Sequence, residues 1–224
     1  MSHGLFRLTG MFSEISARYH LIHFGQIDPH TRSHPVRPPL PQEGTLLLLI
    51  DLQKAIDDPS WGVRNNPSAE ANIVRLLTCW RTAGWPVWHV RHDSTNPVST
   101  YRPGQSGNEF KTDTAPVLGE PVITKNTNSA FIGTDLENRL RADGHHSIVI
   151  AGVITNNSVE STVRMGGNLG FDVYLVSDGC FTFSRVDWNG NYRSAEDVHA
   201  MALANMHPEY CNVVTVDALL HNAY

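Results

Sequence analysis

Unbroken apolar runs alternate along the chain with segments whose apolar positions recur at helical spacing. Residues 45–51 form an aliphatic run that ends in Asp51, which is typical of a strand buried on both faces of a sheet. After Asn66-Pro67, apolar residues recur every three or four positions up to Gly84, and this predicts a helix. The same criteria predict further strands at 85–91, 121–125, 147–151, 172–176 and 212–216.

Helices are predicted in the intervals between the later strands. Thr134 and Glu137 have the spacing of a capping box, and two more helices are expected at about 157–168 and 194–205. Strands that alternate with helices of this length are joined by right-handed crossovers, so the chain is expected to form a parallel sheet with helices on both faces. The polar, irregular segment 92–121 is typical of a functional loop region.

The first 43 residues have a different composition from the rest. They contain His3, His20, His23, His30 and His34, which are five of the 12 histidines, and a proline-rich stretch at 35–41. Prolines favour extended chain, so residues 1–43 are interpreted as an N-terminal extension or arm and residues 44–224 as one domain. The histidine spacing matches no common metal-ligand pattern.

The charge and the cysteine content narrow the functional classes. A formal net charge of −5 argues against a nucleic-acid-binding or anionic-membrane-binding protein. Three widely spaced cysteines (Cys79, Cys180, Cys211) argue against a disulfide framework and suggest a reducing compartment. The longest aliphatic run has five residues, at 46–50, and charged residues interrupt the first twenty. We therefore expect a cytoplasmic protein.

Three residues at predicted strand ends are candidates for chemistry, because ligands of open parallel sheets bind at the carboxyl ends of the strands. Asp51 ends the first strand, Lys125 ends the third, and Ser158 opens the helix after the fourth. Each has an ordinary alternative: a turn-forming aspartate, a solvated lysine and a helix N-cap serine. Their common edge, rather than any one residue, favours a catalytic site.

Several familiar chemistries lack their motifs. The chain contains no G-x-S-x-G elbow and no glycine-rich phosphate-binding motif, so a Ser-His-Asp hydrolase, a dinucleotide enzyme and a phosphoryl transferase are not indicated. His89 and His92 have no clustered cysteine or carboxylate in the sequence, and packed strand histidines are the preferred interpretation.

The three candidate sites resemble the isochorismatase-like cysteine hydrolase family. The similarity extends from about residue 45 to 220 and rests on four segments, namely 47–53 (LLLIDLQ), 125–131 (KNTNSAF), 151–164 (AGVITNNSVESTVR) and 198–203 (VHAMAL). The resemblance implies a three-layer α/β/α fold with a six-stranded parallel sheet of Rossmann-like topology. It also implies a homo-oligomer, either a dimer or a tetramer, and a small-molecule amide or carbamoyl substrate.

The family's catalytic set is aspartate, lysine and cysteine. Asp51 and Lys125 match the first two, but Ser158 stands where the family has its cysteine. A thiolate is a far better nucleophile than a serine hydroxyl beside an Asp–Lys pair, so the chain as printed is expected to be inactive or strongly impaired toward amides. Two explanations remain open: a deliberate Cys→Ser substitution that traps substrate, or a natural variant.

The resemblance therefore leaves three functions. One is cleavage of a C–N bond in a small amide, ureide or carbamoyl compound through a cysteine and a thioester. The second is vinyl-ether hydrolysis, as in isochorismatases, with Asp51 as acid and no nucleophile. The third is non-catalytic binding of a small molecule on the same scaffold.

The resemblance also implies the finer features of the site. It places the oxyanion hole at the backbone N–H groups of Ile154 and Ser158 and a cis peptide bond at Val153–Ile154. Some relatives, the nicotinamidases, ligate a metal with histidines shortly after the aspartate; residues 57–66 contain none, so no metal or other cofactor is expected. Substrate contacts are expected from Gln53, Trp61, Tyr101, Arg102 and Asn157.

Overall fold

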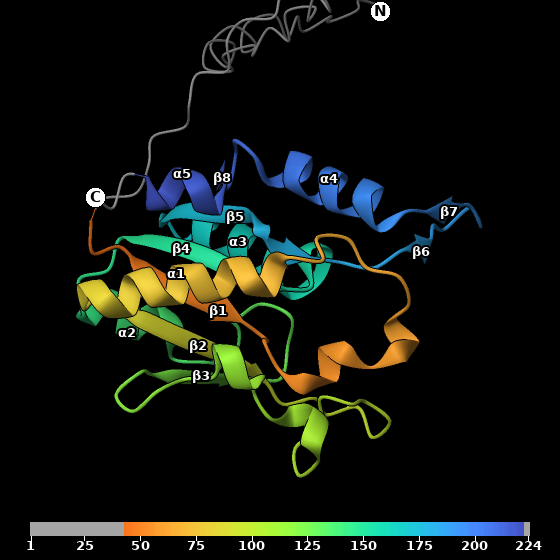
Figure 1. Ribbon diagram of the computed structural model, residues 1–224, viewed down its shortest axis with the longest axis horizontal. Helices are drawn as coiled ribbons and strands as arrows, with labels where there is room; N and C mark the ends of the chain where they lie inside the picture. Colours follow the sequence, from red (N-terminus) through yellow and green to blue (C-terminus); the bar gives the residue numbers. More distant parts are fainter. Residues whose placement is uncertain (1–42, 222–224) are drawn as a thin grey trace, which may run out of the picture. The chain divides into compact units, whose positions relative to one another are not determined.

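A parallel sheet of six strands organises the part of the chain that the computed structural model describes, residues 43–221 (Figure 1). All neighbouring strands are parallel. Their spatial order is β3 (Val122–Lys125), β2 (Val87–His92), β1 (Leu46–Ile50), β4 (Ser147–Val153), β5 (Asp172–Phe181) and β8 (Asn212–Val214). The arm predicted at 1–43 lies outside the described residues, apart from its last position.

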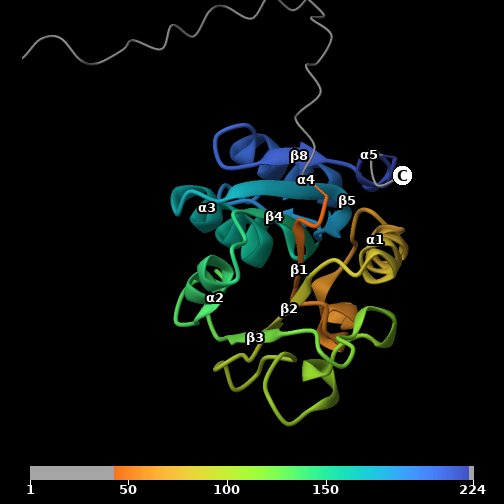
Figure 2. The same cartoon turned by 90° about the vertical axis from the view of Figure 1, so that its left-hand side faces the viewer.

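Helices cover both faces of this sheet, as the two views show (Figures 1 and 2). One core contains α1 (Ala69–Ala83) and α5 (Val216–Leu220). The other contains residues of α2 (Leu136–Ala142), α3 (Glu160–Asn168) and α4 (Ala195–Met206). The predicted three-layer α/β/α fold with a six-stranded parallel sheet is confirmed.

The central strand β1 shows why an unbroken apolar run is needed. Leu47 and Leu49 point into the core with α1, whereas Leu46, Leu48 and Ile50 point into the opposite core. All five side chains are at most 1% exposed. Full burial of each stabilises the fold by about 1.5–3 kcal/mol.

The end of α1 agrees with the sequence prediction, whereas the starts of α1 and α2 differ from it. Helix α1 ends at Gly84, whose φ of 70° is the left-handed conformation expected of a glycine cap. It begins at Ala69 rather than directly after Pro67. The predicted capping box is incomplete, because Thr134 accepts a hydrogen bond from the Leu136 backbone while Glu137 pairs with Arg141 instead.

Strand β5 is longer than predicted and continues past residue 176 to Phe181. Residues 177–179, Ser-Asp-Gly, are typical of turns, but Asn66 holds this segment in place by donating to the Ser177 and Cys180 carbonyls. The register of β4 against β5 shifts at Gly152, where a Cβ would lie 2.3 Å from the Ile50 carbonyl oxygen. Only glycine fits this approach.

The remaining elements are short. A two-stranded hairpin, β6 (Arg185–Val186) and β7 (Tyr192–Arg193), extends beyond the end of β5 and was not predicted (Figure 1). The segment 92–121 lacks long elements, as expected, and contains 3-10 turns at Ser106–Asn108 and Thr112–Thr114. Two more turns lie at Lys54–Asp57 and Pro59–Trp61. Within residues 43–221, no helix combines the length and apolar character needed to cross a bilayer.

Candidate active site

The structure brings Asp51, Lys125 and Ser158 together at the carboxyl edge of the sheet. Asp51 directly follows β1, Lys125 is the last residue of β3, and Ser158 lies in the turn after β4. The Lys125 Nζ donates to Asp51 Oδ2 at 2.7 Å and to Ser158 Oγ at 3.2 Å. Relative exposures of 4%, 3% and 7% show that all three are buried. A carboxyl, an ammonium and a hydroxyl therefore form one hydrogen-bonded group.

The surroundings of Asp51 differ at its two carboxyl oxygens. Its Oδ1 atom is buried and has no hydrogen-bond partner among the described residues, whereas Oδ2 is held by Lys125. Burial raises the pKa of Asp51, and the positive charge and hydrogen bond of Lys125 oppose this rise without cancelling it. The backbone φ of 52° is the left-handed region, a strained conformation for aspartate that is common at functional sites.

A hydrogen bond to helix α4 stabilises the turn that carries Ser158. Residues 155–159 form one π-helical turn, a feature frequent at functional sites, and the Val153–Ile154 peptide bond is cis. The Thr155 hydroxyl hydrogen-bonds His199 Nδ1 at 2.9 Å. The Ser158 carbonyl accepts from the Thr162 hydroxyl in α3. These contacts hold the backbone of the turn, and Lys125 donates to the Ser158 hydroxyl itself.

His92 also belongs to this site, although the sequence favoured a packed strand histidine. It ends β2 beside Lys125, with Nδ1 3.3 Å from the Lys125 Nζ, and its ring contacts Tyr101 edge-on. Burial and the Lys125 charge lower the pKa of His92, which favours the neutral imidazole. His89 does pack in the sheet, where its Nε2 pairs with Glu120 at 2.8 Å. The position of His92 at a strand end was the signal that could have identified it.

No thiol lies in the site. All three cysteines of the chain, Cys79, Cys180 and Cys211, are buried in the cores. Burial raises the pKa of the Cys180 and Cys211 thiols to about 12, so both are protonated at neutral pH. The Ser158 hydroxyl is the candidate nucleophile of the group, because Asp51 and Lys125 are paired with each other.

Residues 45–218 match the isochorismatase domain. The chain belongs to the isochorismatase family. It is 41% identical over 181 residues to the isochorismatase family protein YrdC of Bacillus subtilis, covering 81% of this chain and 97% of that protein. A crystal structure of an isochorismatase-family protein from Chromobacterium violaceum superimposes with a TM-score of 0.79 at 57% identity, covering 83% of this chain and 98% of that one.

Two relatives of this isochorismatase-family hydrolase have names that state an activity. Nicotinamidase 3 of Arabidopsis thaliana is 27% identical over 186 residues, covering 77% of this chain and 85% of that protein. The ureidoacrylate amidohydrolase RutB of Variovorax paradoxus is 26% identical over 186 residues, covering 64% and 72%. Both names describe cleavage of an amide-type C–N bond.

A cavity of about 110 Å³ opens onto the group. Three of the predicted substrate residues, Trp61, Tyr101 and Asn157, line it together with Asp51 and Ser158. The remaining lining residues are His92, Ser99, Asn128, Val153 and Ile154. Within residues 43–221, no three histidine, cysteine or carboxylate side chains are grouped so that they could hold a metal ion.

The other two predicted substrate residues do not line this cavity. Gln53 is 0% exposed, and its amide is fully used by the backbone, accepting from the His92 N–H and donating to the His92 and Asn108 carbonyls. It joins the first loop to the end of β2. Arg102 is exposed and donates to the Pro97 carbonyl. Neither side chain is in a position to contact a ligand beside Asp51.

A second cavity, of about 300 Å³, adjoins the first. The two cavities share Trp61, Ile154 and Asn157 in their walls. The Trp61 ring stacks on Phe183, with centroids 5.7 Å apart, and the Trp61 indole N–H donates to the Ala55 carbonyl. Asp51 and Ser158 therefore line one of two adjoining cavities, and the packed Trp61 ring forms part of the wall of both.

Proposed function

We propose that this isochorismatase-family hydrolase cleaves the C–N bond of a small amide, ureide or carbamoyl compound by nucleophilic attack from residue 158. The observation that carries the proposal is the Asp51 carboxyl, whose Oδ2 is anchored by Lys125 while the buried Oδ1 has no partner. An anchored carboxyl with a raised pKa is suited to accept and return a proton. The relatives named as nicotinamidase and ureidoacrylate amidohydrolase support an amide substrate.

The first half of the proposed reaction forms an acyl-enzyme. Asp51 takes the proton from the side chain at 158, whose oxygen, or sulfur in a cysteine form, attacks the substrate carbonyl carbon. The negative charge that develops on the carbonyl oxygen is stabilised by the backbone N–H groups of Ile154 and residue 158. Protonated Asp51 then gives its proton to the departing nitrogen, and the C–N bond breaks.

The second half releases the acid. A water molecule loses a proton to Asp51 and attacks the acyl carbon, and the bond to residue 158 breaks with return of that proton. Lys125 holds Asp51 in place and stabilises negative charge on both Asp51 and the nucleophile. His92, as a neutral imidazole beside Lys125, adds no competing positive charge.

The nucleophile limits the rate in the chain as printed. A serine hydroxyl ionises much less readily than a thiol, and an Asp–Lys pair lacks the imidazole base of serine hydrolases. We therefore expect slow turnover with Ser158 and faster turnover after Ser158→Cys. The test is ammonia release from a panel of small amides, ureides and carbamates by both forms. Release by neither form, with no acyl adduct in intact-mass spectra, contradicts the proposal.

Vinyl-ether hydrolysis is the second candidate. It is favoured by two observations: Ser158 replaces the family's thiol, and the raised pKa of Asp51 favours the protonated carboxyl that an acid-catalysed reaction needs. This candidate predicts release of pyruvate from isochorismate by the serine form itself. It also predicts that Ser158→Ala leaves the rate within about threefold, since no nucleophile is used. A tenfold or greater loss in that variant would exclude it.

A further inference from the structure

We infer that Arg185 forms an anion-binding subsite for a carboxylate at the far end of the substrate. The inference rests on the proposed amide hydrolysis and specifies its substrate class: amides whose acyl portion carries a terminal carboxylate. Arg185 opens the hairpin that follows β5 and lines the second cavity, which adjoins the catalytic one.

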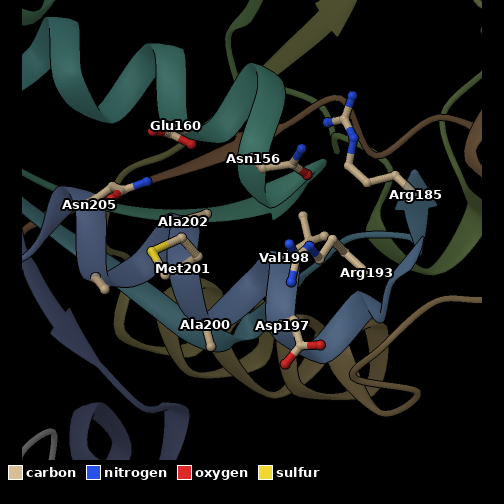
Figure 3. A pocket seen from close by; sticks show the side chains of 11 residues that line it. Asn156, Glu160, Arg185, Arg193, Asp197, Val198, Ala200, Met201, Ala202 and Asn205 are labelled. Atoms are coloured by element: carbon tan, nitrogen blue, oxygen red, sulfur yellow. The ribbon is translucent and has the colours of Figure 1, made fainter. Parts of the chain in front are cut away.

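The cavities form a continuous path from the catalytic group to Arg185. The catalytic cavity shares Trp61, Ile154 and Asn157 with the second cavity. The second cavity shares Asn156 and Arg185 with a wider groove along α4. Figure 3 shows Asn156 and Arg185 at one end of this groove, with Met201 on α4. A substrate with its amide at Ser158 can therefore extend along the Trp61–Phe183 wall toward Arg185.

The positive charge of Arg185 determines which kind of ligand group can bind in the second cavity. Arg185 is the one ionisable side chain among the eight residues that line the second cavity. The others supply apolar surface or neutral hydrogen-bonding groups. They are Trp61, Ile154, Asn156, Asn157, Thr182, Phe183 and Ser184. A cationic fork with no acidic neighbour in the cavity wall favours a carboxylate, which guanidinium binds in a bidentate manner.

The two arginines of the hairpin, Arg185 and Arg193, differ in whether their charge is paired. Arg193, on the opposite strand, is neutralised by Asp187 with a 2.6 Å ion pair. Arg185 makes no side-chain hydrogen bond or ion pair with any residue in the range 43–221. The free cation of this hairpin is thus the one that borders the substrate cleft.

Arg102, which was expected from the sequence to contact substrate, provides the matched control. It is exposed and bonded to the Pro97 carbonyl, and it borders neither cavity. Replacing Arg102 removes the same charge from the protein surface without touching the cleft. A contribution specific to Arg185 is therefore separable from a general change in net charge.

The experiment compares monoamides of α,ω-dicarboxylic acids of three to seven carbons with their neutral methyl esters. Binding to the Ser158 chain is measured by calorimetry, and kcat/KM is measured after Ser158→Cys. We expect the free acid to be preferred about tenfold at one chain length, as one charge-assisted pair supplies. Arg185→Ala removes this preference, Arg185→Lys keeps part of it, and Arg102→Ala leaves it unchanged. The preference weakens as salt increases.

Two results would overturn the inference: equal binding of acids and esters at every length, or an acid preference that persists in Arg185→Ala. The proposed function fails separately. If no amide is cleaved by either form while carboxylates still bind through Arg185, the subsite stands and amide hydrolysis does not. If amides are cleaved without regard to charge, the reaction stands and the subsite does not. Thermal melts of each Arg185 variant verify that the fold is retained.

Discussion

Asp51 and Glu70 are both carboxylates held by a lysine, yet their pKa values shift in opposite directions. Burial would raise the pKa of Glu70, but hydrogen bonds from Arg64 and Lys111 outweigh it and lower the value to about 2. Arg64 reaches both Glu70 oxygens at 2.7 Å, and Lys111 adds a bond at 3.0 Å. At Asp51, burial raises the pKa despite the opposing effects of Lys125 and, more weakly, of Ser158 and His92, and Oδ1 accepts no hydrogen bond from the described residues.

The difference fits a structural role for Glu70 and the proposed catalytic role for Asp51. Glu70 fixes the start of α1 to the loop around Arg64, and its charge is fully compensated. At Asp51, Oδ1 accepts no hydrogen bond from the described residues and the backbone is in a left-handed conformation, two unfavourable features that the proposed proton-transfer role would explain.

Replacing Asp51 is expected to have the largest effect on activity. Asp51→Asn in the Ser158→Cys background lowers kcat/KM for amides by about 10³-fold or more, since no base or acid remains. The melting temperature is expected to fall, because the substitution leaves the buried Lys125 ammonium without its counter-ion, so circular dichroism verifies that the variant is folded under assay conditions. Glu70→Gln, the control, retains activity within about threefold. An Asp51→Asn variant with a tenth of the activity would contradict the assignment.

The second prediction concerns the nucleophile beside Asp51. Ser158→Cys accelerates amide hydrolysis by about 10²-fold, because the thiolate forms more readily beside Lys125. Steady-state ammonia release measures it. Ser99→Cys is a control that puts a thiol into the same cavity away from Lys125, and no acceleration is expected there. Equal rates in the two cysteine variants would show that position 158 has no special role.

The third prediction uses pH to distinguish the two carboxylates. Amide hydrolysis requires ionised Asp51, so its rate rises with pH through a pKa above the ordinary aspartate value. Glu70 has a folded pKa lowered to about 2, so it stabilises the fold above its ordinary pKa and loses this contribution as pH falls toward 2. Rate profiles and urea titrations measure the two effects. A rate that falls as Asp51 ionises would indicate the vinyl-ether reaction.

The smallest expected effect is on stability. Glu70→Gln lowers the free energy of unfolding at neutral pH by about 1–2 kcal/mol, since its partners Arg64 and Lys111 are partly exposed and solvent screens the pairing. Chemical denaturation at pH 7 measures this change. Glu109→Gln, which removes a more exposed pair with Lys54, changes stability by less than about 0.5 kcal/mol. Similar losses in both variants would remove the distinction drawn for Glu70.

Much of the fold could be predicted because buried strands and helices have characteristic spacings of apolar residues in the sequence. The run at 46–50 had to be a central strand, and the spacing before Gly84 had to be a helix. The continuation of β5 past residue 176 depends on Asn66, which is more than 100 residues away in sequence. The hairpin at 185–193 has strands of two residues, too short for any periodicity to show.

The sequence predicted the site residues whose positions follow from sheet topology. Asp51, Lys125 and Ser158 follow from the rule that parallel strands end at one edge. Gln53 and Arg102 were expected to bind substrate, but side-chain direction is set by tertiary contacts that sequence spacing does not specify. His92 and Arg185 were missed for the same reason, since one lies at a strand end among packed residues and the other in the unpredicted hairpin.

The proposed acyl-enzyme mechanism is tested most directly by intact-mass spectrometry of the Ser158→Cys protein mixed rapidly with a cleavable amide. The same measurement is made on the protein that also carries Asp51→Asn. We expect a transient mass increase equal to the acyl group, mapped by peptide digestion to residue 158 and absent from the Asp51→Asn protein. Turnover of the amide with no adduct at residue 158, or with undiminished rate after Asp51→Asn, would contradict it.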